Sequence, residues 1–274
     1  MPSTRGWSTV PTNSPAVLFT RTTYLGIIPT AGQRPFTYAA LDAELRLLAL
    51  SEGDFEAVAA FAGGQRAAFV AISAPPRPNQ GLMRSQERRA ALNPAPRPGR
   101  WENCRVAEYL LAHEGIAIPL TPNSAEKCPR WKQMGMKLFQ TLASQGYAPY
   151  PSEANPERQT LETYPHAVFT RLLGHAPFPK HTLEGRIQRQ LVLRECELDL
   201  PNPMRVFEEI TRHRLLQGIL PLDDLYSSAE LDALSAAYVA FLAAHHPKKI
   251  DLLGNPAEGQ IALPRMSSSQ RTHN

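Results

Sequence analysis

The chain has 274 residues, of which 43% are hydrophobic and 20% are charged, and its mean hydropathy is -0.30. That composition is typical of a folded globular protein and excludes a largely disordered chain. No run of residues reaches the roughly 18 consecutive apolar positions that a membrane span needs, and residues 1–15 lack an apolar signal segment. We therefore expect neither a membrane span nor secretion, and no membrane partner.

The cysteine count and the net charge indicate the cellular compartment and the kind of partner. The three cysteines are far apart in the sequence and form no Cys-x-x-Cys pair, so neither a disulfide framework nor a zinc site is indicated. We expect a reducing, cytoplasmic location. The 29 lysines and arginines exceed the 25 acids by four, and the pI is near 9.0, which favours an anionic partner.

The first third of the chain predicts strands followed by a helix and another strand. Three segments rich in β-branched, aromatic and aliphatic residues predict neighbouring strands at residues 16–30, 35–41 and 45–50. An apolar-periodic helix follows, from Phe55 to the Gly63-Gly64 pair, and residues 67–72 are entirely apolar, as in a buried strand. The acids between these elements, Asp42 and Asp54, are interpreted as a turn residue and a helix cap.

Residues 75–105, which we call the basic segment, carry an unusual concentration of positive charge. The segment contains seven arginines and only two acids, which gives a local charge of +5. Its six prolines predict a long loop or flap. The arginines either hold phosphates or form a solvated surface loop. Trp101, near the end of the segment, either stacks on a base or anchors the loop to the core.

The rest of the chain predicts helices around at least one further strand. Helical spacing and stop signals recur up to residue 216, and an apolar stretch follows near the end. The expected helices cover residues 105–114, 132–144, 166–173, 182–194 and 203–216, and the expected strands cover 160–164 and 261–263. The fold class that follows is an α/β sandwich with a mixed sheet. We expect one domain over residues 16–265, a flexible segment over 1–15 and a disordered tail over 266–274.

The last long helix has the clearest boundaries. Ser227 and Glu230 have the spacing of a capping box, which satisfies the free amides at a helix start. One strip of the helix carries mostly small side chains, so the helix can approach a sheet closely. Asp232 lies on that strip and either reaches the level of the strand ends or acts as a favourable charge near the helix N-terminus. The residues alone favour the second interpretation.

Several segments together resemble the domain-of-unknown-function family 429 (DUF429), whose members are regarded as RNase H-like predicted nucleases. The matching segments, in chain order, are 25–32 (LGIIPTAG), 34–42 (RPFTYAALD), 70–75 (VAISAP), 162–167 (ETYPHA), 180–189, 232–233 and 253–259 (LGNPAEG). The Glu-x-Tyr-Pro-His box is the most distinctive of them. The resemblance implies an RNase H-like mixed sheet flanked by helices, with the basic, proline-rich segment as a long insertion.

The resemblance also implies a cluster of carboxylates that holds two divalent ions, Mg²⁺ or Mn²⁺. The family pattern places aspartates at the ends of two strands, where this sequence has Ile28 and Ser73. The remaining site residues are Glu162 and Asp232, as metal ligands and catalytic groups, and His166, as a general base or ligand. His166 could instead bond backbone carbonyls. Two carboxylates leave such a site underligated, so we expect metal binding to be weak or absent.

A nucleic-acid partner is the binding prediction that follows. Lys180, Arg186 and Arg189 match the basic helix of the family, and the two arginines share a helix face that suits phosphate contacts, although a solvent-facing helix would look the same. The predicted nucleic-acid-binding residues are therefore Arg77, Arg84, Arg88, Arg89, Lys180, Arg186 and Arg189.

Three hypotheses follow from the sequence. The first is a catalytically impaired nuclease-fold protein that still binds nucleic acid. The second is an active metal-dependent nuclease or phosphohydrolase that uses Glu162, Asp232 and His166. The third is a non-enzymatic protein-interaction module with the proline-rich segment as its docking site. No motif decides DNA against RNA, and the oligomeric state stays open.

Overall fold

The computed structural model describes residues 22–32, 34–97, 99–154 and 156–266. The segment expected to be flexible, residues 1–15, lies outside the described residues, as do 16–21 of the first predicted strand and 267–274 of the predicted tail. All statements below concern the described residues.

The first half of the sheet has the predicted order of strands. Strands β1 (Thr23–Ile28), β2 (Phe36–Leu41) and β3 (Leu47–Gly53) form an antiparallel meander, and β4 (Ala68–Ile72) pairs parallel to β1. The third strand begins two residues later than expected because Leu45 adopts φ +58° in the turn before it. The meander, the helix and the buried strand predicted from the sequence are therefore confirmed.

The second half of the sheet adds one long strand and a hairpin. Strand β6 (Arg158–Glu162) pairs parallel to β4, and β8 (Gly259–Pro264) joins β6 through Glu162 and Ile261. Strand β7 (Ile250–Asn255), which the sequence analysis missed, pairs antiparallel to β8. The short strand β5 (Ala148–Pro149) pairs with the start of β6. The strand order is β3-β2-β1-β4-β6-β8-β7, with β5 beside β6, which makes one mixed sheet of eight strands.

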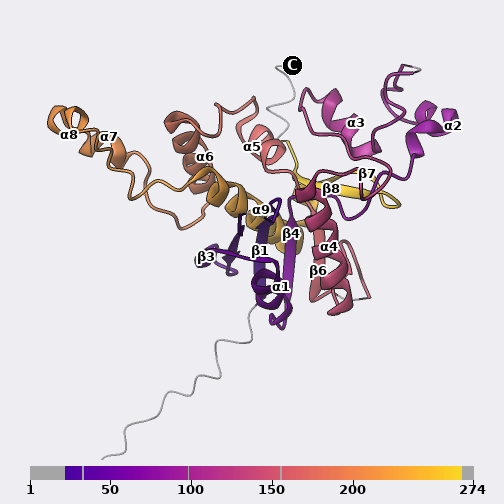
Figure 1. Ribbon diagram of the computed structural model, residues 1–274, viewed down its shortest axis with the longest axis horizontal. Coiled ribbons are helices and arrows are strands. Elements are labelled where there is room, and N and C mark those ends of the chain that lie inside the picture. Colours follow the sequence, from indigo (N-terminus) through magenta and orange to yellow (C-terminus); the bar gives the residue numbers. More distant parts are fainter. Residues whose placement is uncertain (1–21, 33, 98, 155, 267–274) are drawn as a thin grey trace, which may run out of the picture.

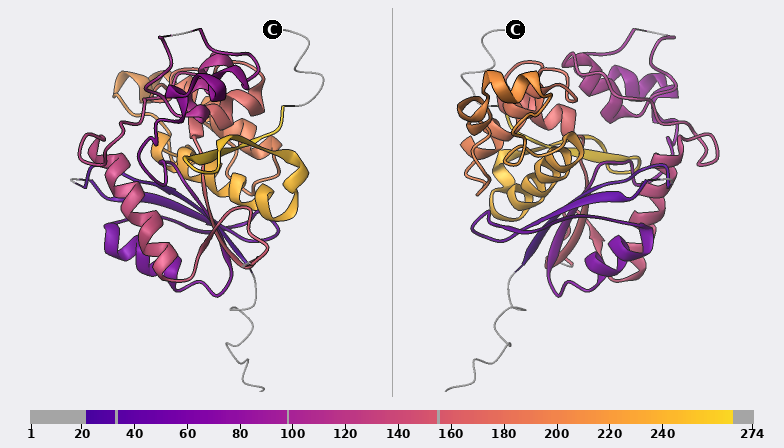
Figure 2. Two further views of the ribbon diagram at one scale, coloured as in Figure 1. Left: turned by 90° about the vertical axis from the view of Figure 1, so that its right-hand side faces the viewer. Right: turned by 60° about the vertical axis from the view of Figure 1, so that its left-hand side comes forward.

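Helices cover both faces of this sheet (Figures 1 and 2). Helix α9 (Ser228–His245) packs on one face with α5 (Pro165–Leu173) and α6 (Leu183–Glu195) beside it, whereas α1 (Phe55–Gly63) and α4 (Arg130–Ser144) pack on the other. The small side chains of α9 allow a very close approach to β1. A Cβ atom added to Gly26 would lie 2.1 Å from the carbonyl oxygen of Ala233.

Two predicted segments differ from the structure. The basic segment is not a plain loop, because it contains the 3-10 helix η2 (Leu82–Arg84) and the helix α2 (Gln86–Ala90) before α3 (Val106–His113) begins. The single helix predicted over residues 203–216 is wrong, since the chain forms α7 (Arg205–Glu209) and α8 (Arg212–Leu216). The side chain of Thr211 accepts a hydrogen bond from the Arg214 amide and so begins a new helix there.

The arm formed by α7 and α8 reaches away from the sheet in Figure 1 and exposes large apolar side chains, such as Leu216, which is 76% exposed.

After the C-terminal end of α9, the 3-10 helix η3 (Pro247–Lys249) leads into β7. None of the helices in the described part of the chain has the length and apolar character that crossing a membrane requires.

Candidate functional site

The register of the sheet separates the predicted site residues onto two faces. Ile27, Ile72 and Glu162 lie side by side on neighbouring strands. Successive side chains on a strand point to opposite faces, so Ile28 and Ser73, one residue further on, face α9, whereas Glu162 faces the side of α1 and α4. Ile28, Ser73 and Glu162 therefore share an end of the sheet, but Glu162 lies on the other face.

A cavity of about 440 Å³ opens where β1 and β4 end, on the side of α9. We call it the strand-end cavity. It brings together six of the residues that the sequence analysis singled out: Ile28, Ser73, His166, Lys180, Arg189 and Asp232. Of the two interpretations of Asp232, the structure supports the one in which this aspartate reaches the strand ends.

Asp232 is the only carboxylate among the lining residues of the strand-end cavity. Asp232 is 7% exposed, and its Oδ2 accepts a hydrogen bond of 3.0 Å from Nζ of Lys180. The side chain of Lys180 is 47% exposed. Burial raises the pKa of Asp232, and Lys180 and Arg189 work against that rise. Burial lowers the pKa of His166, helped by Arg189, which favours a neutral imidazole beside the cavity.

The predicted phosphate-binding face of α6 points into the protein. Arg189 is 2% exposed, and its Nη1 donates to the carbonyl oxygens of Phe178 and Gly185 at 2.8 and 2.9 Å. Its buried Nε has no hydrogen-bond partner among the described residues. Arg186 donates to two carbonyl oxygens in the loop before α9, at residues 225 and 226. Of the three basic residues matched in this region, Lys180 is the one that keeps half its side chain exposed.

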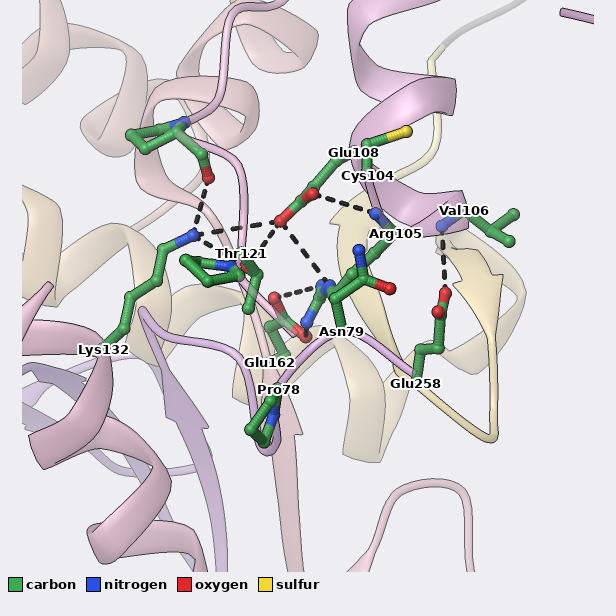
Figure 3. Close-up of polar contacts among 12 residues, drawn as sticks. Pro78, Asn79, Cys104, Arg105, Val106, Glu108, Thr121, Lys132, Glu162 and Glu258 are labelled. Carbon is green, nitrogen blue, oxygen red and sulfur yellow. Dashed lines mark hydrogen bonds and ion pairs between the residues drawn. The ribbon is translucent and has the colours of Figure 1, made fainter. Parts of the chain in front are cut away.

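Glu162 lies in a different environment, shown in Figure 3. It is 5% exposed, and both of its carboxylate oxygens accept hydrogen bonds from Arg105, at 2.7 and 3.0 Å. Arg105 is itself 1% exposed. Burial raises the pKa of Glu162, and Arg105 opposes that rise. The fork-to-fork geometry makes this a strong, specific ion pair.

Further buried charges surround this pair. Glu108, at the start of α3, accepts a hydrogen bond of 3.0 Å from the Arg105 amide and lies 3.9 Å from Nζ of Lys132 on α4. Glu258, which is 0% exposed, accepts hydrogen bonds from the amides of Leu82 and Val106. The members of this buried network are Arg105, Glu108, Lys132, Glu162 and Glu258. It ties the basic segment, at Leu82 and at Arg105, to residues of the sheet region.

The sequence analysis missed four of these five residues. Arg105 could not be told apart from the other six arginines of the basic segment, and Lys132 looked like an ordinary member of an amphipathic helix. Two signals were available: the Arg105 and Glu108 spacing of a helix start, and the position of Glu258 inside the Asn-Pro-Ala-Glu-Gly motif.

The donors present do not fit a two-metal centre. Glu162 and Asp232 face different sides of the sheet, and each is already paired with a cation. Ile28 offers no ligand atom, and Ser73 offers only a neutral hydroxyl. Over the described ranges, no group of three His, Cys, Asp or Glu side chains could hold a metal ion. We therefore derive no metal-dependent step from this arrangement.

The arginines of the basic segment divide into an inward and an outward group. Arg89 donates to the carbonyl oxygens of Met83 and Arg84, at 2.6 and 3.0 Å, and so holds α2 against η2. The outward group keeps its side chains exposed to solvent and consists of Arg77, Arg84, Arg88, Arg97 and Arg100. Trp101 packs against Tyr109, with ring centroids 5.5 Å apart, which favours the anchoring interpretation.

Fold and site together define an α/β protein with a mixed sheet compatible with an RNase H-like domain. A family model described as "Protein of unknown function (DUF429)" matches residues 38–252, so the chain belongs to that family. No curated protein and no solved structure matches the chain.

Proposed function

We propose that this protein binds nucleic acid through the basic segment and does not cleave it by the two-metal chemistry associated with its fold. The observation that carries the proposal is the outward group of five arginines. The acids of the segment are Glu87, which is exposed, and Glu102, whose side chain is 43% exposed and lies 3.6 Å from Arg89. A surface with this excess of arginine matches the charge of a phosphate backbone.

The way in which the basic segment is held supports binding further. Asn79 accepts a hydrogen bond from the Gly81 amide at 2.7 Å and donates to the carbonyl oxygen of Asn103 at 3.0 Å. The side chain of Glu258 binds the amide of Leu82, within the segment, and the amide of Val106, directly after it. Arginines on an anchored segment lose less conformational freedom when they bind phosphates than arginines on a free loop.

The strand-end cavity supports the second half of the proposal. A nuclease of this fold needs several carboxylates that converge on one place. In the strand-end cavity, the residues near Asp232 are instead Ile28 and Ser73. The hypothesis of an active phosphohydrolase relies on Glu162 and Asp232 acting together. Because they face opposite sides of the sheet, the geometry supports that hypothesis less well.

Salt-dependent binding tests the first half. Fluorescently labelled single- and double-stranded DNA and RNA are titrated with the full chain over a range of salt concentrations. We expect R84E/R88E to weaken binding at least about tenfold and to reduce the slope of log K against log salt by about 2. R66E/K248E makes the same charge change at exposed positions outside the segment and should have a much smaller effect. Failure of DNA and RNA alike to bind at low salt would refute the proposal.

Cleavage assays test the second half. The same labelled strands are incubated with the protein and Mn²⁺, with and without a chelator. We expect the strands to stay intact in every lane. Cleavage that a chelator abolishes, and that D232N also removes, would instead establish the active phosphohydrolase.

A further inference from the structure

A second cavity, of about 480 Å³, lies where the sheet divides. One edge of β6 pairs with β4 along its length, and the other edge pairs first with β5, at Gln159 and Thr160, and then with β8, at Glu162. Between β5 and β8 the strands diverge. The space between them, which we call the fork cavity, is lined by these strands, by one side of α4 and by the start of the basic segment.

The walls of the fork cavity are mainly apolar. The rings of Phe139 and Tyr147 contribute from the side of α4, and prolines also line the cavity. The hydroxyl of Tyr147 donates to the carbonyl oxygen of Ala62 at 2.7 Å, and the guanidinium of Arg158 lies 4.4 Å from the ring centroid. Both contacts hold this ring in place, so the wall is fixed before any ligand enters.

Three polar side chains on the lining could give a ligand its orientation. The amides of Gln140 and Gln260 each offer a donor and an acceptor, and Gln260 makes one long bond of 3.4 Å to the carbonyl oxygen of Gly254. Arg77 is exposed and makes a single bond of 3.3 Å to the carbonyl oxygen of Ala257. The carboxylate of Glu162 also lines the cavity, but its ion pair with Arg105 weakens its repulsion of an anion.

We propose that the fork cavity binds one unstacked nucleobase with its sugar and that Arg77 binds the attached phosphate. A base presents apolar faces to the aromatic walls and a hydrogen-bonding edge to the two glutamines. The volume lies within the range of small-ligand sites. Arg77 is also the first arginine of the outward group, so a strand held by the basic segment would reach the fork cavity. The inference thus rests on the proposed function and deepens it.

The consequence is a preference for single strands. A base in a duplex must leave its stack before it can enter a cavity, whereas a base in a single strand is already accessible. We expect a single strand to bind about tenfold more tightly than a duplex of equal length at the same salt concentration, because stacking on aromatic side chains contributes that much per base.

The test fills the cavity from its surface side. Ala143 is an exposed residue of α4 that lines the fork cavity, so A143F should obstruct the cavity without disturbing the core. Ala60, an exposed residue of α1 that does not line it, supplies the matched control A60F. We expect A143F to weaken single-strand binding about tenfold and to leave duplex binding unchanged, so that the two affinities become equal. A60F should change neither affinity.

Free mononucleotides distinguish a base site from general attraction to a strand. AMP and UMP are added to the full chain, and saturation-transfer NMR records contact with the base protons. The signal should vanish in A143F and persist in A60F. R77Q should weaken the binding of AMP more than the binding of adenosine, which lacks the phosphate. An A143F variant that binds single strands and mononucleotides as the natural chain does would overturn the proposal.

Failure of the two proposals can be told apart. If R84E/R88E weakens all strands while A143F has no effect, the basic segment binds nucleic acid and the fork cavity does not. If mononucleotides contact the cavity but no strand binds at low salt, the proposed function fails and the base site remains.

Discussion

Glu162 and Asp232 lie at the same end of the sheet and differ in the cation that accompanies them. The partner of Glu162 is Arg105, with 1% of its side chain exposed, whereas the partner of Asp232 is Lys180, with 47% exposed. Glu162 is held by two hydrogen bonds inside a network of five charged residues. Asp232 accepts its hydrogen bond from Lys180 at the wall of an open cavity.

This difference indicates how much each carboxylate contributes to the fold. Removal of one member of a buried pair leaves an isolated charge without water, which is strongly destabilising. Removal of one member of a half-exposed pair lets water solvate the other, and the cost is small. Glu162 is therefore part of the structure that anchors the basic segment, whereas Asp232 remains available to a ligand in the strand-end cavity.

The largest effect is expected from Arg105→Met, which removes the cation that Glu162 and Glu108 share. The free energy of unfolding should fall by about 3–5 kcal/mol, because the carboxylates left behind are buried. Urea denaturation followed by circular dichroism measures it.

Arg46→Met is the matched control for that substitution. Arg46 pairs with Asp42, but 55% of its side chain is exposed, so the loss of stability should be much smaller than for Arg105→Met. If the two variants lost equal stability, the distinction between the buried network and a surface ion pair would be wrong.

A smaller effect is expected from Ile28→Asp/Ser73→Asp, which adds two carboxylates to the strand-end cavity. Without metal, the added charges beside Asp232 should lower the free energy of unfolding by about 2 kcal/mol. Mn²⁺ should then raise the Tm of the double variant and leave the natural chain unchanged, because only the variant has three converging carboxylates.

Addition of D232N to the double variant supplies the control. The triple variant should lose the response to Mn²⁺, which differential scanning fluorimetry can follow. A response that persisted without Asp232 would mean that the metal binds elsewhere.

Local patterns predicted much of the fold because local interactions fix it. Alternating and continuous apolar runs predicted most of the strands, although not β7, and the Ser227 and Glu230 capping box forms as expected. Asp54 caps α1 through the Ala57 amide at 2.8 Å, and Asp42 binds the amides of Glu44 and Arg46, as a turn residue should. Each of these contacts spans four residues or fewer, so the sequence nearby is enough to specify it.

The remaining features depend on partners that are distant in the sequence. Glu162 meets Arg105 across 57 residues, and Val106 meets Glu258 across 152, and no local pattern records such contacts. The face toward which Glu162 points depends on the strand register, where a shift of one residue reverses every side chain. The family resemblance supplied Glu162, Asp232 and Lys180, but it did not supply Arg105, the cation that pairs with Glu162.

The smallest effect is expected from Asp232→Asn, measured against pH. Burial raises the pKa of Asp232 in the folded protein, so the folded state holds this proton more tightly than the unfolded chain does. That contribution is present at low pH and is lost as the pH rises from the ordinary aspartate value through the raised one. The asparagine side chain does not titrate, so the variant does not lose stability in this way as the pH rises. Its stability relative to the natural chain should therefore improve as the pH rises from the ordinary aspartate value to neutrality, and the nearby charge of Lys180 limits the gain. Urea titrations across that range measure the difference. A loss above about 3 kcal/mol at neutral pH would place Asp232 in the same class as Glu162, as a carboxylate on which the fold depends.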